Sequence, residues 1–160
     1  MTRILALDLS LTSTGAAHEG GTCRITSKKR GTERLIEIRE AIRSLALSVA
    51  PDLVVVEGYS MGSRGRVFDI GELGGIVKVL LADMGIPVAI VPPSCLKKFA
   101  TGKGNADKDS MLEAAIRNFG FGGHGNDEAD AWLLYCMAAT RDGSLNAKQR
   151  EAVAAVEWPL

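Results

Sequence analysis

The chain has 160 residues, 46% hydrophobic and 24% charged, with nineteen basic and nineteen acidic side chains. These proportions exclude wholesale disorder and collagen-like or coiled-coil fibres, and the balanced charge argues against a nonspecific nucleic-acid coat protein. A chain of this length can bury one sufficient core. We expect a single domain over residues 1–160, with its core at about 3–140 and a C-terminal helical extension over 141–160.

No segment predicts export or membrane insertion. The longest apolar runs, at 76–82 and 87–93, are far shorter than the ~20 residues that a membrane span needs, and the first residues lack a signal-peptide layout. The three cysteines form no CxxC pair, which fits a reducing compartment. We expect a cytoplasmic protein with no membrane partner.

Three strands and a helix are predicted in the first third of the chain. Residues 4–7 form a continuous apolar run, typical of a strand buried on both faces. Gly20 and Gly21 separate the next two strand patterns and predict a two-residue hairpin turn. Apolar residues at three- and four-residue spacing then mark one face of a helix. The predicted elements are strands over 3–9, 13–18 and 22–27 and a helix over 32–49.

Strands and helices alternate in the rest of the chain. A glycine- and serine-rich segment, 58–65, follows the fourth strand, and Gly85 is expected to end the second helix. The glycines inside that helix lower its intrinsic stability unless a close neighbour needs a small surface. The predicted elements are strands over 53–57 and 86–91 and helices over 67–84, 94–100, 108–119, 127–140 and 146–156.

This order predicts an α/β fold. Strands joined by hairpins run antiparallel, and strands separated by helices run parallel with right-handed crossovers. We therefore expect a mixed five-stranded sheet, three antiparallel strands and then two parallel ones, with helices on both faces. This is the order of the RNase H-like fold, although many α/β layouts satisfy the pattern.

Four acidic residues occupy informative positions in this layout. Asp8 interrupts the first apolar strand, where an unpaired carboxylate is costly, and Glu57 ends the fourth strand. If these strands are parallel neighbours, both carboxylates point to one edge of the sheet. Asp127 and Asp130 share a face at the start of a helix, with Asn126 as a plausible N-cap.

Together these acids predict a divalent-metal site. Taken singly, Glu57 is an ordinary strand end and Asp127 a favourable charge on the helix dipole. Four carboxylates at one edge, however, would repel each other without a cation, and hard oxygen ligands suit Mg²⁺ or Mn²⁺. Such a set can hold two ions about 3.5–4 Å apart, the arrangement used for in-line displacement at phosphorus. We expect phosphodiester hydrolysis.

Basic residues gather in two segments, 24–43 and 97–108. A neutral protein that combines basic patches with an acidic pocket can hold a phosphate backbone. Taken alone, either segment is better explained as solvated surface.

The motifs resemble, in order, those of the RuvC family of Holliday-junction resolvases within the RNase H-like nucleases. The matching segments are Ile4-Leu5-Ala6-Leu7-Asp8 with Thr14-Gly15, then Val54-Val55-Val56-Glu57, then Leu96-Lys97-Lys98 through Gly102 to Lys108, and finally Asp127-Glu128-Ala129-Asp130-Ala131. The resemblance covers roughly residues 3–140.

The resemblance implies a homodimeric, structure-selective endodeoxyribonuclease of a bacterium or phage-infected host, which cuts four-way DNA junctions by paired nicking. Helix 67–84 is our candidate for the dimer surface. The implied site residues are the catalytic, metal-binding tetrad Asp8, Glu57, Asp127 and Asp130, with Lys97 and Lys108 at or near the scissile phosphate. Further DNA contacts are expected from Tyr59, Arg64, Arg66, Lys98 and Lys103.

The chain departs from the family pattern beside the acids. Leu9-Ser10 stand where the family has Pro-Gly, and Ser60 stands where it has a junction-opening aromatic residue. We expect Tyr59 to take that place by stacking on a base. These departures leave two alternatives open: a broader RNase H-like nuclease acting on flaps, forks or RNA/DNA hybrids, and a non-catalytic junction-binding protein.

Overall fold

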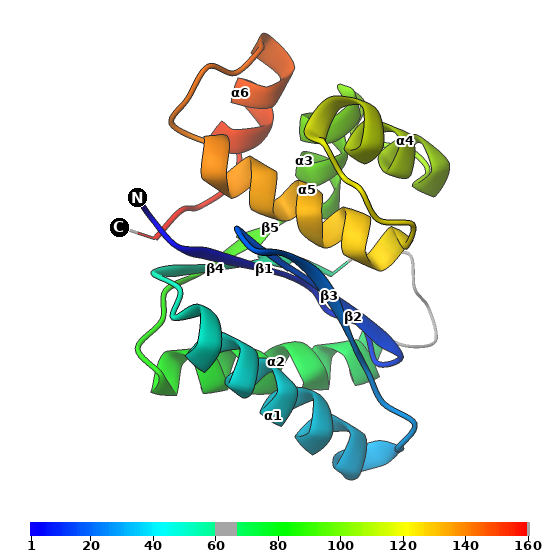
Figure 1. The fold of residues 1–160 in the computed structure, drawn as a ribbon, viewed down its shortest axis with the longest axis vertical. Helices are drawn as coiled ribbons and strands as arrows, with labels where there is room; N and C mark the ends of the chain where they lie inside the picture. The colour runs from blue at the N-terminus through cyan, green and yellow to red at the C-terminus, as the bar shows by residue number, and fades with distance from the viewer. Residues whose placement is uncertain (60–66, 160) are drawn as a thin grey trace.

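The computed structural model describes residues 1–59 and 67–159. Within them, five strands form one mixed sheet in the order β3-β2-β1-β4-β5 (Figure 1). Its strands are β1 (Ile4–Asp8), β2 (Ser13–His18), β3 (Gly21–Thr26), β4 (Leu53–Glu57) and β5 (Val88–Val91). The first three pair antiparallel, and β1, β4 and β5 are parallel, so the predicted sheet is confirmed.

Helices cover both faces of this sheet, as predicted. Figure 1 shows helices below the sheet and above it. The lower pair is α1 (Gly31–Val49) and α2 (Val67–Asp83), and the upper group is α3 (Pro93–Thr101), α4 (Lys108–Phe119), α5 (Asn126–Thr140) and α6 (Ala147–Ala154).

The apolar run of β1 is explained by burial on both faces. Ile4 and Ala6 belong to the core beneath α3–α6, whereas Leu5 and Leu7 belong to the core above α1 and α2. Successive side chains of a strand point to opposite faces, so Asp8 continues the face of Ile4 and Ala6. β1 therefore directs its last side chain toward the layer that contains α5.

The same alternation holds in β4. Leu53 and Val55 pack in the α3–α6 core, and Val54 and Val56 pack in the opposite core. Glu57 thus emerges on the same face as Asp8. The parallel register, which pairs Leu7 with Val56, places both acids at the carboxyl edge of the sheet.

Two local predictions are wrong. The hairpin turn consists of Glu19 and Gly20, because Gly21 already pairs with His18 in the ladder. Asn126 is the first residue of α5 and not its cap; Gly125 occupies the N-cap position. The other strand and helix ends differ from the predicted ones by at most two residues.

The C-terminal extension packs against the rest of the chain. Ala152 and Val156 belong to the same core as α3, α4 and α5. The Trp158 indole donates a hydrogen bond to the Val153 carbonyl, 3.0 Å away, which fixes the segment that follows α6. Residues 141–159 thus continue the upper layer.

The three cysteines are free thiols and are half-buried beside the two cores. Among the described helices, none combines the length and the apolar character that crossing a membrane requires.

Candidate metal centre

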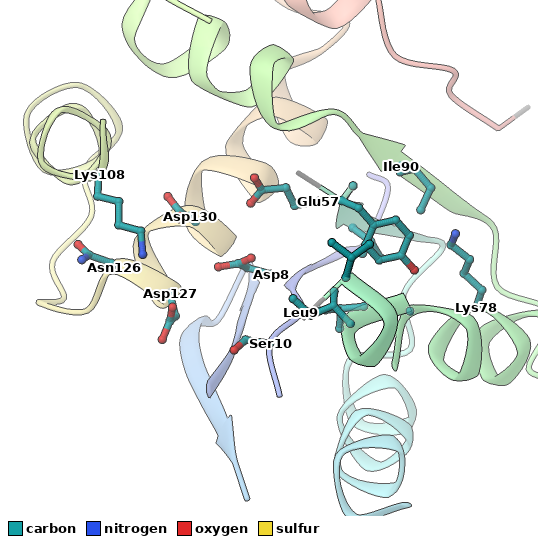
Figure 2. Close-up of a pocket in the computed structure, with 16 residues that line it drawn as sticks. Asp8, Leu9, Ser10, Glu57, Lys78, Ile90, Lys108, Asn126, Asp127 and Asp130 are labelled. Atoms are coloured by element: carbon teal, nitrogen blue, oxygen red, sulfur yellow. The ribbon is translucent and has the colours of Figure 1, made fainter. Parts of the chain in front are cut away.

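Three carboxylates from different elements meet at the carboxyl edge of the sheet. Asp8 ends β1, Glu57 ends the adjacent β4, and Asp130 lies in α5 above them. One oxygen of each carboxylate lies within 4.8 Å of the other two. Figure 2 shows the three side chains turned toward one another. This set offers hard oxygen ligands to a divalent ion.

Asp127 lies beside this set rather than in it. It precedes Asp130 by one turn of α5, and its side chain lines the same pocket. In Figure 2 its carboxylate stands apart from the other three. Asp127 is nevertheless close enough to raise the pKa values of Asp8 and Asp130. The structure therefore presents three convergent carboxylates and a fourth at their margin.

Burial and mutual repulsion act on all three convergent acids. Burial raises the pKa of Asp8 well above its usual value, and the charges of Glu57, Asp130 and Asp127 add to the rise. The pKa of Glu57 rises to about 7, through burial and then the charge of Asp130. That of Asp130 rises to about 6, through burial and then the charge of Asp127. Burial and like charge thus both favour the protonated forms of these carboxyl groups.

Two of the predicted lysines face this cluster. Lys97 of α3 lowers the pKa values of Glu57 and Asp130, which partly opposes their rise. Lys108, the first residue of α4, acts in the same direction on Asp130 and lines the pocket. A phosphate drawn to the acids through a divalent ion would meet both ammonium groups.

A glycine allows α5 to approach the sheet closely. Gly15 of β2 pairs with Asp8. A Cβ atom on Gly15 would lie 2.0 Å from the backbone oxygen of Asp127, a distance that no side chain tolerates. Arg24 of β3 pairs loosely with Glu128 of α5, at 3.9 Å. These contacts hold the first turn of α5 over β2 and β3.

The loop after β1 is fixed by a buried threonine. Thr14, fully buried, accepts a hydrogen bond from the Ser10 backbone N–H at 3.0 Å and donates one to the Ser10 carbonyl at 2.8 Å. Leu9 and Ser10 stand where the family has Pro-Gly, and both line the pocket. The hydrogen bonds between Thr14 and Ser10 thus hold the loop in place, although the loop lacks the Pro-Gly pair.

The acids line one end of a pocket of about 380 Å³. Tyr59, which is 43% exposed, and residues of α2 also line this pocket. Figure 2 shows Lys78 of α2 on the opposite side of the acids from Lys108. The Tyr59 ring lies against Gly74, where a Cβ atom would be 1.9 Å from the hydroxyl oxygen. Lys78 Nζ lies 5.5 Å from the centre of that ring. The pocket therefore combines an acidic end with an aromatic one.

Other predicted site residues lie elsewhere. Lys98 forms an ion pair with Glu151 of α6, and Lys103 is exposed in the loop between α3 and α4. Arg64 and Arg66 lie outside the described residues.

Three pocket residues with polar side chains were not predicted as site residues from the sequence: Ser10, Lys78 and Asn126. Lys78 sits inside a long helix, where a lysine normally indicates a solvated face. Asn126 was explained as a cap. The sequence around Lys78 and Asn126 therefore does not indicate that either residue lines a pocket.

The sheet order, the two helical layers and the edge carboxylates define an RNase H-like protein with a candidate metal centre. The family profile described as "Crossover junction endodeoxyribonuclease RuvC" matches residues 12–132. The chain belongs to the RuvC family.

Curated relatives with that name align with part of the chain. The one from Synechococcus sp. (strain WH7803) is 33% identical over 97 residues, which cover 61% of this chain and 63% of the relative. The one from Gloeobacter violaceus is 32% identical over 100 residues, 62% of this chain and 58% of the relative. The alignments therefore span less than two thirds of these relatives.

Solved structures of Thermus thermophilus RuvC have the same fold. One gives a TM-score of 0.73 at 17% identity and covers 98% of this chain and 99% of its own. A second, RuvC in complex with Holliday junction substrate, gives 0.72 at 18% identity and covers 99% of this chain and 100% of its own.

Proposed function

We propose that the chain is a divalent-metal-dependent endonuclease that resolves four-way DNA junctions by paired nicking. The observation that carries this proposal is the convergence of Asp8, Glu57 and Asp130 within 4.8 Å at the edge of an RNase H-like sheet. A binding module has little use for a cluster of mutually repelling carboxylates. Membership of the RuvC family supports the junction as substrate.

The donor set fits Mg²⁺ or Mn²⁺. It consists of carboxylate oxygens without a thiol or imidazole, which suits hard cations. The mutual repulsion that raises the pKa values of these three acids supports a bound cation among them. We propose that Asp8, Glu57 and Asp130 hold the metal and that Asp127 completes the set for a second ion. When bound, the metal ions supply Lewis-acid activation of phosphodiester hydrolysis.

The remaining residues of the site bind and orient the substrate in this proposal. Lys97 and Lys108 give point charges to the phosphate that is cut. Tyr59, backed by Gly74, offers a ring face on which a base can stack. Lys98, Lys103, Arg64 and Arg66 remain proposed contacts to the DNA backbone.

We further propose that the active form is a homodimer in the cytoplasm of a bacterium or phage-infected host, with residues 1–160 acting as one domain. Two symmetric cuts require two sites, and each chain provides one acidic cluster. The T. thermophilus neighbour was solved with a Holliday junction, and we infer branched DNA as the partner of this chain too.

The decisive experiment compares wild-type protein and Asp8→Asn on a synthetic four-way junction with Mg²⁺. We expect the variant to lose cleavage by at least about 100-fold, because one metal ligand is removed, and to keep junction binding. Asp142→Asn, which removes the same charge from a 91% exposed side chain, is the matched control and should cleave normally. Products are read at nucleotide resolution on all four strands.

The same assay distinguishes the alternatives. Y-shaped, linear and RNA/DNA hybrid substrates are tested in parallel with the junction. Cutting confined to RNA strands would overturn the resolvase proposal in favour of an RNase H-like activity. Junction binding with no metal-dependent cutting by wild-type protein would identify a binding protein. Undiminished cutting by Asp8→Asn would show that the acids are assigned wrongly.

A further inference from the structure

Four cations gather where the chain leaves β3 and enters α1. We call this group the basic turn; it consists of Lys28, Lys29, Arg30 and Arg34. Among residues 1–59 and 67–159, no carboxylate lies within 4.0 Å of any of these four side chains. Further along α1, by contrast, Arg39 and Arg43 share Glu40. The basic turn therefore presents uncompensated charge.

Hydrogen bonds hold the basic turn in one conformation. The Lys29 backbone N–H donates to the Ser27 hydroxyl at 3.2 Å, and that hydroxyl donates to Glu37. The Arg34 guanidinium donates through Nε to the Lys29 carbonyl at 2.7 Å. The nearby acid Glu37 is thus engaged with Ser27 and leaves the lysines free. Binding a ligand here would cost little ordering of the backbone.

The start of α1 adds to this positive charge. Arg30 occupies the N-cap position and its side chain makes no capping hydrogen bond. Glu33 is the acid of the first turn. The N-terminal end of a helix carries partial positive charge, which disfavours clustered cations and favours an anion. A negatively charged partner would relieve this repulsion.

The basic turn follows a strand that ends at the same edge of the sheet as the acids, and Figure 1 shows the chain running from there down to the start of α1, below the sheet. Asp8 pairs with Gly15 and Gly15 pairs with Arg24, so one row crosses three strands. Arg24 is therefore two strand spacings, about 10 Å, from Asp8 along the sheet. β3 ends at Thr26, paired with the first residue of β2, and in Figure 1 it leaves the sheet at the end where α5 begins.

The acids lie between two basic regions. Lys97 belongs to α3, which follows β5 at one side of the sheet, whereas the basic turn follows β3 at the other. A nucleic-acid strand that crosses this edge over the acids would meet cations before and after the cut phosphate.

We propose that the basic turn binds the phosphate backbone of the duplex arm that leaves the cleavage site over β2 and β3. This inference rests on the proposed function and assigns a path to its substrate. Flexible lysines act on phosphates as point charges, so the contact is independent of base sequence and sensitive to salt.

The test measures binding of a four-way junction between 50 and 200 mM salt, in the Asp8→Asn background, so that cleavage does not interfere. The variant Lys28→Gln/Lys29→Gln/Arg30→Gln removes three cations from the exposed surface. We expect at least about 10-fold weaker binding and a slope of log affinity against log salt that is less steep by up to about 2.7.

The matched control is Arg117→Gln/Lys148→Gln/Arg150→Gln, which removes three charges from α4 and α6. Thermal unfolding checks that all variants fold. An equal loss of junction binding in both triple variants would overturn this inference but not the proposed function. Unchanged binding by the basic-turn variant would do the same. Failure of the Asp8→Asn protein itself to bind the junction would instead overturn the proposed function, and the inference with it.

Discussion

Two acids of the cluster make the stability of the metal-free protein depend on pH. Unfolded, Glu57 and Asp130 ionise at their ordinary values of 4.5 and 3.8, whereas in the fold their pKa values are about 7 and about 6. Between these values the folded chain holds more protons than the unfolded one. Its stability therefore falls as pH rises from about 4 to about 7 and then levels off.

Divalent ions should reverse this loss. We expect the Tm measured in EDTA to fall between pH 5 and pH 8, and 10 mM Mg²⁺ at pH 8 to restore it by several degrees, because the ion binds the folded state. Asp8→Asn, which removes one repelling charge, should melt higher than wild type in EDTA at pH 8 and respond less to Mg²⁺. A Tm that is independent of both pH and Mg²⁺ would contradict a metal site here.

Sequence predicts these acids better than it predicts their surroundings. Asp8 is conspicuous because a carboxylate inside an apolar run is costly, and strand alternation puts Glu57 on the same face. The marginal position of Asp127 depends on how α5 is tilted over the sheet. The contact of Tyr59 with Gly74 is likewise a tertiary contact between a strand end and a helix. No local pattern encodes either feature.

At the scale of elements, the close approach of α5 to β2 decides whether the cluster forms. In Gly15→Ala the new methyl group would meet the backbone of Asp127, which cannot yield without moving the helix. We expect a loss of about 1–3 kcal/mol in unfolding free energy and a weaker response of the Tm to Mg²⁺, because Asp130 moves with α5.

A second glycine provides the control. Gly75 of α2 is exposed, and a Cβ atom there would meet nothing within 4 Å. Gly75→Ala should raise stability by about 0.5–1 kcal/mol, because glycine inside a helix is entropically costly, and should leave the Mg²⁺ response intact. An unaltered Mg²⁺ response in Gly15→Ala would show that the helix can shift without disturbing the cluster.

The order and type of the elements were predictable because each has a strong period or a clear end. Lys108–Phe119 agrees at both ends with the predicted helix, since Asp107 caps it and Gly120 ends it in a left-handed conformation. The hairpin turn was predicted one residue late. Two adjacent glycines both permit a turn, and only the register with His18 decides between them.

At the scale of the whole molecule, the lower helical layer is where we expect the second copy of the proposed homodimer to pack. Large hydrophobic side chains are exposed along both of its helices: Ile36, Leu47, Val67, Phe68 and Val79. Isolated exposed side chains are ordinary, but a group of them on one face marks an interaction surface. We propose that α2 forms the centre of the homodimer interface.

Val79, 62% exposed in α2, is the position that tests this interface. Sedimentation should give twice the chain mass of 17.0 kDa for wild type and the single mass for Val79→Glu, because a buried unpaired charge is costly. Ile116→Glu, at a 48% exposed position on α4, is the control and should remain dimeric. Loss of the dimer should also uncouple the two nicks. A dimeric Val79→Glu would place the interface elsewhere.

The acids of the centre are far apart in the order of synthesis. β1 and β4 emerge from the ribosome early, whereas Asp130 is made more than seventy residues after Glu57. A nascent chain therefore carries two of the three convergent acids until α5 has been translated and has packed on Gly15. A chain truncated before α5 would keep Asp8 and Glu57 but lack Asp130, so the group of three convergent carboxylates cannot form before α5 has been translated.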